Sequence, residues 1–242
     1  MVAKKTWEPE LVLALIGGIM AAFFFGNLAV ALLRQAGVAG FKGEDSMGAV
    51  LLATLSFQGA AVVLGAGFLK YHDTGWREVM GGASWKRCLA LAVAVLAIVA
   101  PLMFALKFLS EFVLEKLHFP VADQRAVELI ISAKTPWLSA YLVFFAVVLA
   151  PLGEEFFFRG LLFSTAKRFG WPKVGWLGVS FLFALVHLNA PTFLPLFALA
   201  LALTWLYERT EGLLAPILAH SLFNVANLLL LLLREKYGPA SS

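Results

Sequence analysis

Charged residues are scarce in this sequence. Only 14% of its 242 residues are Asp, Glu, Lys or Arg, whereas a soluble domain carries about 25%. Apolar runs of about 20 residues, long enough to cross a bilayer, recur along most of the chain. We therefore predict an all-α, polytopic helical membrane protein whose single transmembrane domain covers residues 1–242, surrounded by the lipid bilayer. The net charge of +4 is scattered over short connecting segments, which argues against a nucleic-acid partner.

Cysteine and the common catalytic motifs are nearly absent. Cys88 is the only cysteine, so an intramolecular disulfide and a cysteine metal cluster are both excluded. The chain has no HExxH zinc motif and no nucleophile elbow of the G-x-S-x-G kind. Cys88 and Ser221 lack matched partners for a triad, so covalent catalysis is disfavoured. No internal repeat is visible, which weighs against transporters built from inverted repeats.

The apolar runs predict about seven transmembrane helices, with a range of six to eight, around a polar cavity within the membrane. A fourth span starts near Trp137, and the other spans are expected at residues 10–33, 47–69, 88–112, 174–188, 192–207 and 213–233. The first run is too long for a signal peptide, so we expect it to be retained as a membrane helix. Residues 1–114 contain only generic hydrophobic spans.

Polar residues outside the spans bear on topology. Lys and Arg, among them Lys4 and Lys5, are slightly more numerous on the side that holds the N-terminus. Since basic loops face the cytoplasm, we predict a cytoplasmic N-terminus in the plasma (inner) membrane. Residues 115–136 form the most polar segment, with Asp123, Gln124 and Lys134. Their loosely amphipathic pattern fits either an interfacial helix or a lid.

Three charged residues interrupt a very apolar stretch at residues 151–159, PLGEEFFFR. A charge at membrane depth costs at least about 2.5 kcal/mol, so these residues call for a specific role. Glu155 and Arg159 are four residues apart with the acid first, the favoured orientation for an ion pair on one helix. Glu154 lies about 100° round the helix from Glu155, so we expect it to lack a permanent counter-ion and to face an enclosed cavity. The alternative, a buried ionic clip between helices, suits Glu155 and Arg159 better than Glu154.

Polar residues of the later spans repeat at helical spacing. Phe183 and His187 are four residues apart near the end of the expected fifth span, and His220, Asn224 and Asn227 share one face of the seventh. A lone histidine on a helix is more often a satisfied core residue than a catalyst. Because each of these polar groups would be costly against lipid, we expect them to converge on one polar cavity.

The expected depths of Glu154 and His187 disagree. In a straight helix that starts at Trp137, Glu154 lies about 25 Å along the span, near the membrane face of the N-terminus. His187 then lies about 20 Å from that face. Either the fourth helix starts outside the membrane, or Pro151 and the loop after Arg168 reshape the bundle.

Three motifs occur in order on successive helices: EExxxR (Glu154, Glu155, Arg159), FxxxH (Phe183, His187) and HxxxN (His220, Asn224). Through this ordered set, residues 137–233 resemble the CAAX protease and bacteriocin-processing family, also called Abi. That family includes the type II CAAX prenyl endopeptidases. The first three expected spans carry no part of the resemblance.

The resemblance implies an intramembrane endopeptidase with its catalytic core in residues 137–233. It assigns the activation of a water molecule to Glu154, helped by His187, and the stabilisation of the oxyanion to His220 and Asn224. The chemistry of the residues agrees, because a carboxylate can serve as a general base and amide and imidazole N–H groups can serve as donors. The residues expected to support these four are Glu155, Arg159, Phe183 and Asn227.

Zinc is the open alternative within the protease hypothesis. Glu154, His187 and His220 would make a plausible set of two histidines and one carboxylate. We nevertheless expect no metal cofactor, because HExxH is absent and Asn224 is a poor zinc ligand. The substrate class implied by the resemblance is a peptide or a lipidated protein. A prenylated CAAX protein and a bacteriocin leader both fit.

Two other classes of function fit the same composition. A non-catalytic scaffold or immunity-type protein of this architecture would keep its phenotype in a Glu154→Gln variant. A transporter coupled to protons or ions would also hold Glu and His within the membrane, and it would show pH-dependent flux in liposomes. The ordered motifs favour the protease over both alternatives.

Overall fold

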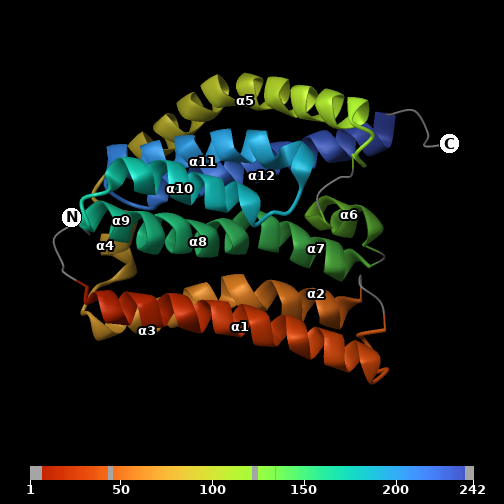
Figure 1. Cartoon of the computed structure of the whole chain (residues 1–242), viewed down its shortest axis with the longest axis horizontal. Helices are drawn as coiled ribbons and strands as arrows, with labels where there is room; N and C mark the ends of the chain where they lie inside the picture. Colours follow the sequence, from red (N-terminus) through yellow and green to blue (C-terminus); the bar gives the residue numbers. More distant parts are fainter. Residues whose placement is uncertain (1–6, 43–45, 122–124, 134, 238–242) are drawn as a thin grey trace.

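The computed structural model describes residues 7–42, 46–121, 125–133 and 135–237, which fold almost entirely into helices (Figure 1). The all-α prediction is confirmed. Lys4, Lys5, Asp123, Gln124 and Lys134, which entered the topology predictions, lie outside the described residues. The α-helices are α1 (Pro9–Gln35), α2 (Met47–Thr54), α3 (Ala60–Tyr71), α4 (Trp76–Met80), α5 (Trp85–Lys116), α6 (Arg125–Ser132), α7 (Pro136–Phe144), α8 (Ala150–Glu155), α9 (Ser164–Arg168), α10 (Pro172–Leu185), α11 (Ala190–Thr210) and α12 (Leu214–Tyr237).

Six helices in this part of the chain are long and apolar enough to cross a membrane, as expected of an integral multi-pass membrane protein. They cover Pro9–Gln35, Met47–Tyr71, Trp85–Lys116, Pro136–Arg168, Ala190–Thr210 and Leu214–Leu233. The predicted fifth span instead forms α10, whose 14 residues reach only about 21 Å against a hydrocarbon core of about 30 Å. Six is within the predicted range of six to eight spans; it is one fewer than the seven drawn, because a turn at residues 186–189 ends α10 early.

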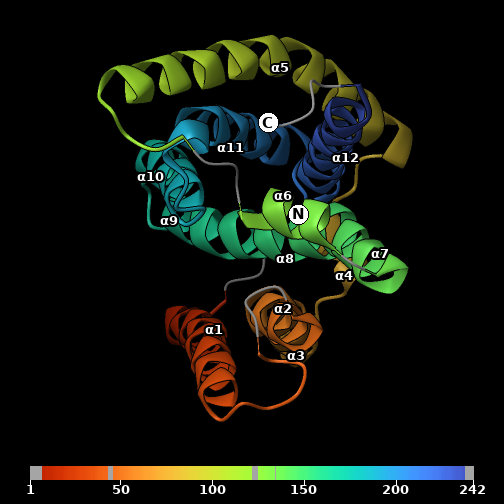
Figure 2. The same ribbon diagram turned by 90° about the vertical axis from the view of Figure 1, so that its right-hand side faces the viewer.

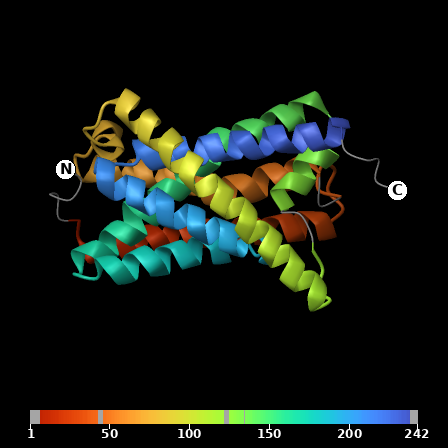
Figure 3. The ribbon, with the colours of Figure 1, turned by 90° about the horizontal axis from the view of Figure 1, so that it is seen from above.

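The helices lie on two sides of one central helix, Pro136–Arg168, which comprises α7, α8 and α9. On one side are α1 and the continuous pair α2 and α3 (Figures 1 and 2). On the other side are α10, α11, α12 and the outermost helix α5, which crosses α11 and α12 obliquely (Figure 3). We call α1, α2 and α3, with the turn between α2 and α3, the N-terminal layer.

α11 is the most enclosed of the long helices. Half of the residues in its most apolar stretch are buried, compared with 11% of those in the corresponding stretch of α5. The buried residues Leu199, Leu203 and Leu206 follow the spacing of one helix face. On α5, Ile98 and Phe108 remain exposed, as expected of a helix that faces lipid. The interior of the protein therefore gathers around α11 and the central helix.

The central helix is 33 residues long, and its length resolves the disagreement in depth. It continues past Glu154 to Arg168, about 21 Å further along its axis. From Pro172, α10 and the turn after it then return about 22 Å to His187. Glu154 and His187 therefore lie at similar levels, because the central helix runs on past Glu154 before α10 turns back.

π-Helical turns interrupt the second span and the central helix. They are η2 (Leu55–Gly59), η3 (Phe145–Leu149) and η4 (Phe156–Phe163), and such turns are frequent at functional sites. In η3 the Ala150 N–H bonds the carbonyl of Phe145, five residues back. In that register the carbonyl of Ala146 would pair with residue 151. Because residue 151 is a proline without an N–H, this carbonyl is left for a partner outside the helix.

Part of the polar segment 115–136 is helical. α6 covers Arg125–Ser132. Its Leu129 packs against Val50 of α2 and Leu138 of α7, in a small apolar cluster separate from the main core. α6 therefore covers the junction between the N-terminal layer and the start of the central helix.

Candidate active site

Glu155 and Arg159 form the predicted ion pair, and both side chains are fully buried. Arg159 Nη1 lies 2.9 Å from Glu155 Oε1. α11 accepts the other hydrogen bonds of the guanidinium: Arg159 Nε donates to Thr204 Oγ1 at 3.3 Å, and Nη2 donates to the carbonyl of Ala200 at 2.9 Å. Arg159 therefore fastens the central helix to α11 at the most enclosed part of the fold.

His220, on α12, contacts Glu155 directly. Its Nδ1 lies 2.9 Å from Glu155 Oε1, the oxygen that Arg159 also contacts. Because an ionised carboxylate only accepts hydrogen bonds, Nδ1 carries the hydrogen and donates it. The ring is thereby oriented with Nε2 toward Glu154, at 4.0 Å from Glu154 Oε2. Glu155 thus orients His220, a contact that helical spacing alone did not predict.

Glu154 has an amide partner but, in the described part of the chain, no Lys or Arg within 4 Å. Its Oε1 accepts a hydrogen bond from Gln58 Nε2 at 3.3 Å. Its Oε2 is buried without a hydrogen-bond partner. Glu154 keeps 12% of its side chain exposed, whereas Glu155 has none. The gap of 4.0 Å between Glu154 Oε2 and His220 Nε2 is too long for a direct hydrogen bond and short enough for one water molecule to bridge.

The ring of Phe183 connects the remaining motif residues. Its centroid lies 4.9 Å from the ring of His187 and 5.7 Å from that of His220. The guanidinium of Arg159 lies over the same ring at 4.8 Å, a favourable cation–π distance. Phe183 is fully buried and forms the wall against which both histidines lie.

The sequence suggested that His187 lies near the end of a span. In the structure it lies in the turn after α10. Its Nδ1 is 2.7 Å from the carbonyl oxygen of Phe183, and its side chain is half-buried. In the described structure His187 forms no hydrogen bond or ion pair with Glu154, and it joins the cluster through the Phe183 ring. The turn is tight, because Leu188 adopts a positive φ of 49°.

Asn224 and Asn227, expected on one face of the last span, have different surroundings. Asn224 Nδ2 donates to the carbonyl of Ala146 at 2.7 Å, which is the carbonyl that Pro151 leaves without a helical partner. Asn224 therefore ties α12 to η3. Asn227 is exposed, so sharing a helix face does not give the two amides the same surroundings.

The three residues considered for zinc are not assembled as a ligand set. Among the described residues, no group of three His, Cys, Asp or Glu side chains is close enough to hold one ion. His220 Nδ1 faces Glu155, and His187 Nδ1 faces a carbonyl oxygen. The remaining donors of Glu154, His187 and His220 do not converge, so this arrangement does not fit a zinc ion.

Two polar residues of the cluster lie outside the three motifs. Gln58 comes from η2 in the second span, and Thr204 comes from α11. The signal that could have identified Gln58 is its amide within an otherwise apolar span, since such groups are costly in lipid. The site therefore extends beyond residues 137–233 into the N-terminal layer.

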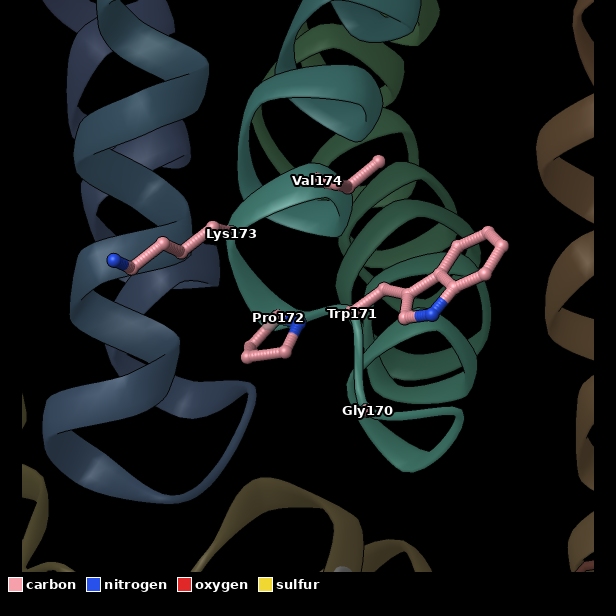
Figure 4. Close-up of a pocket in the computed structure, with 5 residues that line it drawn as sticks. All are labelled: Gly170, Trp171, Pro172, Lys173 and Val174. Atoms are coloured by element: carbon pink, nitrogen blue, oxygen red, sulfur yellow. The ribbon is translucent and has the colours of Figure 1, made fainter.

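A surface pocket lies apart from this cluster, at the turn between α9 and α10 (Figure 4). Its volume is about 520 Å³. In Figure 4, Trp171 and Lys173 extend to opposite sides, so the pocket does not direct polar groups toward one point. It lies roughly 20 Å along the central helix from Glu154, and we assign it no part in the site. Its lining residues are Gly170, Trp171, Pro172, Lys173 and Val174.

Comparison with known proteins finds a family match in the region that holds the three motifs. Residues 136–226 match the sequence model of the family described as type II CAAX prenyl endopeptidase Rce1-like. The UPF0177 protein YxdF of Lactococcus lactis subsp. lactis (strain IL1403) is 33% identical over 79 residues, which cover 32% of this chain and 43% of that protein. No solved structure matches. The resemblance predicted from the three motifs is therefore confirmed: over residues 136–226 the chain is similar to the type II CAAX prenyl endopeptidases, a protease-type family.

Proposed function

We propose that this protein is an intramembrane endopeptidase that hydrolyses peptide bonds with a water molecule activated by Glu154. The observation that carries the proposal is the free Oε2 of Glu154, which faces His220 Nε2 at 4.0 Å inside the Rce1-like region. A carboxylate oxygen without a Lys or Arg partner among the described residues and an oriented imidazole, close enough for one water molecule beside them to contact both, are the components of general-base hydrolysis.

The charges of the cluster favour one shared proton. Glu154 and Glu155 carry two negative charges and Arg159 carries one positive charge, which leaves one negative charge in a buried site. An additional proton on the pair formed by Glu154 and His220 makes the cluster neutral, and a neutral cluster is less costly to bury. With this proton on His220, the ring donates from Nδ1 to Glu155 and from Nε2 toward the gap.

The steps follow from these positions. Glu154 takes a proton from water while the water oxygen bonds to the carbonyl carbon of the peptide. His220 Nε2–H donates to the resulting oxyanion, and Glu154 then gives its proton to the departing amine as the C–N bond breaks. His187 assists from the Phe183 wall, and the second N–H of the Asn224 amide is the further donor to the oxyanion. Glu155 and Arg159 hold His220 in place.

The substrate of this site is a peptide or lipidated protein within or at the membrane. The Rce1-like region supports a prenylated CAAX protein, and a bacteriocin-type leader peptide satisfies the same chemistry. We assign the steps to the chain's own residues and to no zinc ion, since Glu154, His187 and His220 do not converge on one position. The plasma membrane and a cytoplasmic N-terminus remain part of the proposal.

The test is a Glu154→Gln variant of the full chain reconstituted in liposomes, with a fluorogenic prenylated CAAX peptide and an unmodified leader-type peptide as substrates. Loss of a general base lowers the rate about 10²- to 10⁴-fold, whereas the unfolding temperature stays near that of the unaltered protein. The matched control is Glu208→Gln, which makes the same chemical change at a surface ion pair with Lys167. Full cleavage by the Glu154→Gln protein would refute the proposal.

The same variant, expressed in cells and reconstituted in liposomes, separates the two alternative functions. A scaffold or immunity-type protein retains its cellular phenotype in the Glu154→Gln variant, because its partners do not depend on this carboxylate. A proton- or ion-coupled transporter produces pH-dependent flux across the liposome membrane without a cleaved product. Cleavage that depends on Glu154 is the result that only the protease produces.

A further inference from the structure

We infer that Gln58, in the second span, is a positioning residue that orients the general base Glu154. The inference rests on the proposed function and extends it to a part of the chain that lies outside the three motifs. Its basis is the hydrogen bond that Gln58 Nε2 donates to Glu154 Oε1 at 3.3 Å. It joins residues 96 positions apart and connects the N-terminal layer to the site.

The hydrogen bond distinguishes the two oxygens of Glu154. Oε1 is held by Gln58, and Oε2 has no hydrogen-bond partner and faces His220 Nε2 at 4.0 Å. A carboxylate rotates about its last bond unless one oxygen is held, because that torsion is broad. Gln58 therefore keeps the reactive oxygen directed at His220 Nε2, where the proposed function requires the water molecule.

The second span and the central helix approach each other closely at Gln58, because residue 153 is a glycine. A Cβ atom on Gly153 would lie 3.1 Å from both the Cα and the carbonyl oxygen of Gln58, so a side chain there would push the two spans apart. The neighbouring residues reinforce the register, because the rings of Phe57 and Phe157 meet edge to face with centroids 5.2 Å apart. Gln58 also lies in the π turn η2, the kind of helical irregularity that often accompanies function.

A second hydrogen bond across the same interface provides a matched comparison. Thr54 Oγ1 and Tyr141 Oη lie 2.6 Å apart, one helical turn before Gln58 on the second span. This contact also joins the second span to the central helix, and it does not involve Glu154. If Gln58 only helped to dock the N-terminal layer, its loss would have the same effect as the loss of the Thr54 hydroxyl.

The test compares Gln58→Met with Thr54→Val in the reconstituted full chain. Gln58→Met keeps the length of the side chain and removes the donor. We expect its kcat to fall roughly ten- to 150-fold, the range for a hydrogen bond to a charged group, with KM nearly unchanged. Thr54→Val is expected to keep kcat within about twofold of the unaltered protein, since the contacts of Glu154 remain. Equal losses of kcat in the two variants would overturn the inference.

A spectroscopic readout keeps the inference testable apart from activity. With ¹³C-labelled glutamate, the infrared carboxyl band that disappears in Glu154→Gln belongs to Glu154. We expect this band to shift in Gln58→Met and to stay in place in Thr54→Val, and an unshifted band in Gln58→Met would overturn the inference. If the unaltered protein cleaves neither peptide, the proposed function fails, while the band still decides whether Gln58 holds Glu154.

Discussion

The two acids of the EExxxR motif are adjacent in the sequence, but they lie in different regions of the molecule. Glu155 belongs to the enclosed region with α11 and α12, where Arg159 and His220 share its Oε1 and its exposure is zero. Glu154, whose side chain is 12% exposed, lies between the central helix and the N-terminal layer, where Gln58 is its hydrogen-bond partner. The enclosed region pairs Glu155 with Arg159 and orients His220, whereas one oxygen of Glu154 has no hydrogen-bond partner among the described residues.

The largest effect is expected where the enclosed region is broken. Arg159→Leu leaves Glu155 buried with only His220 as a partner, and the loss of one member of a buried ion pair costs about 3–5 kcal/mol. Chemical unfolding in detergent micelles measures this loss of stability. The double variant Glu155→Leu with Arg159→Leu removes both charges and is expected to be more stable than Arg159→Leu alone. If the double variant is less stable than Arg159→Leu alone, the assignment of Glu155 and Arg159 as a buried ion pair is contradicted.

A smaller effect is expected where the N-terminal layer meets the central helix. A Cβ on Gly65 of α3 would lie 2.5 Å from Phe156 Cε1, in a fully buried ring. We expect Gly65→Ala to lower the free energy of unfolding by about 1–3 kcal/mol through overpacking, and to lower activity by moving Gln58 away from Glu154. Thermal unfolding and cleavage rates are the two measurements.

The control for this prediction lies two residues away on the same helix. A Cβ on Gly67 would meet no atom within 4 Å. Gly67→Ala is therefore expected to be neutral or to raise stability by up to about 1 kcal/mol, because alanine favours the helix. Similar losses in the two variants would show that α3 does not dock at Phe156 as described.

A still smaller effect is expected at Asn224, which joins the enclosed region to η3. Asn224→Leu removes the donor to the half-buried carbonyl of Ala146 and should cost about 1 kcal/mol. In a Pro151→Ala background the new backbone N–H can satisfy this carbonyl, so the same substitution should cost less. Unfolding midpoints of the four proteins in this cycle give the coupling. Equal costs in both backgrounds would show that the contribution of Asn224 to stability does not depend on Pro151.

The smallest effect is expected at the surface ion pair between Lys167 and Glu208. Their charged atoms lie 2.6 Å apart, with side chains 46% and 30% exposed. Since exposed pairs contribute little, Lys167→Ala should change stability by less than about 1 kcal/mol, and less at high salt. A loss as large as that of Arg159→Leu would mean that burial is not what distinguishes the two pairs.

Much of the fold was predictable, because the length of a membrane helix is set by the bilayer and its composition by lipid. The structure confirms the all-α architecture and the ion pair of Glu155 with Arg159, and the family comparison confirms the resemblance. The predicted span at 174–188 was wrong in extent, because a short apolar helix and a spanning helix look alike until the turn at His187 is seen. The fourth span was predicted with a start but no end, and the structure continues this helix past Pro151 to Arg168.

The partners of the site residues were less predictable. Helical spacing gave the faces of His220 and Asn224, but it could not say that His220 contacts Glu155 or that Asn224 contacts Ala146. Gln58 was hidden among generic spans, since a single amide in an apolar run carries no motif. These contacts depend on which helices are neighbours, and the pattern of one helix does not contain that information.

By itself, the sequence determined the membrane-spanning, helical character of the chain and singled out Glu154, His187, His220 and Asn224 as polar residues in an apolar chain, because solvation cost and helical period act locally along the chain. Helical spacing also separated the Glu155–Arg159 pair from Glu154, and the tertiary structure alone decided the other partners of the two acids. Those partners depend on packing: α11 and α12 enclose Glu155, whereas the second span approaches Gly153 closely enough to place Gln58 on Glu154.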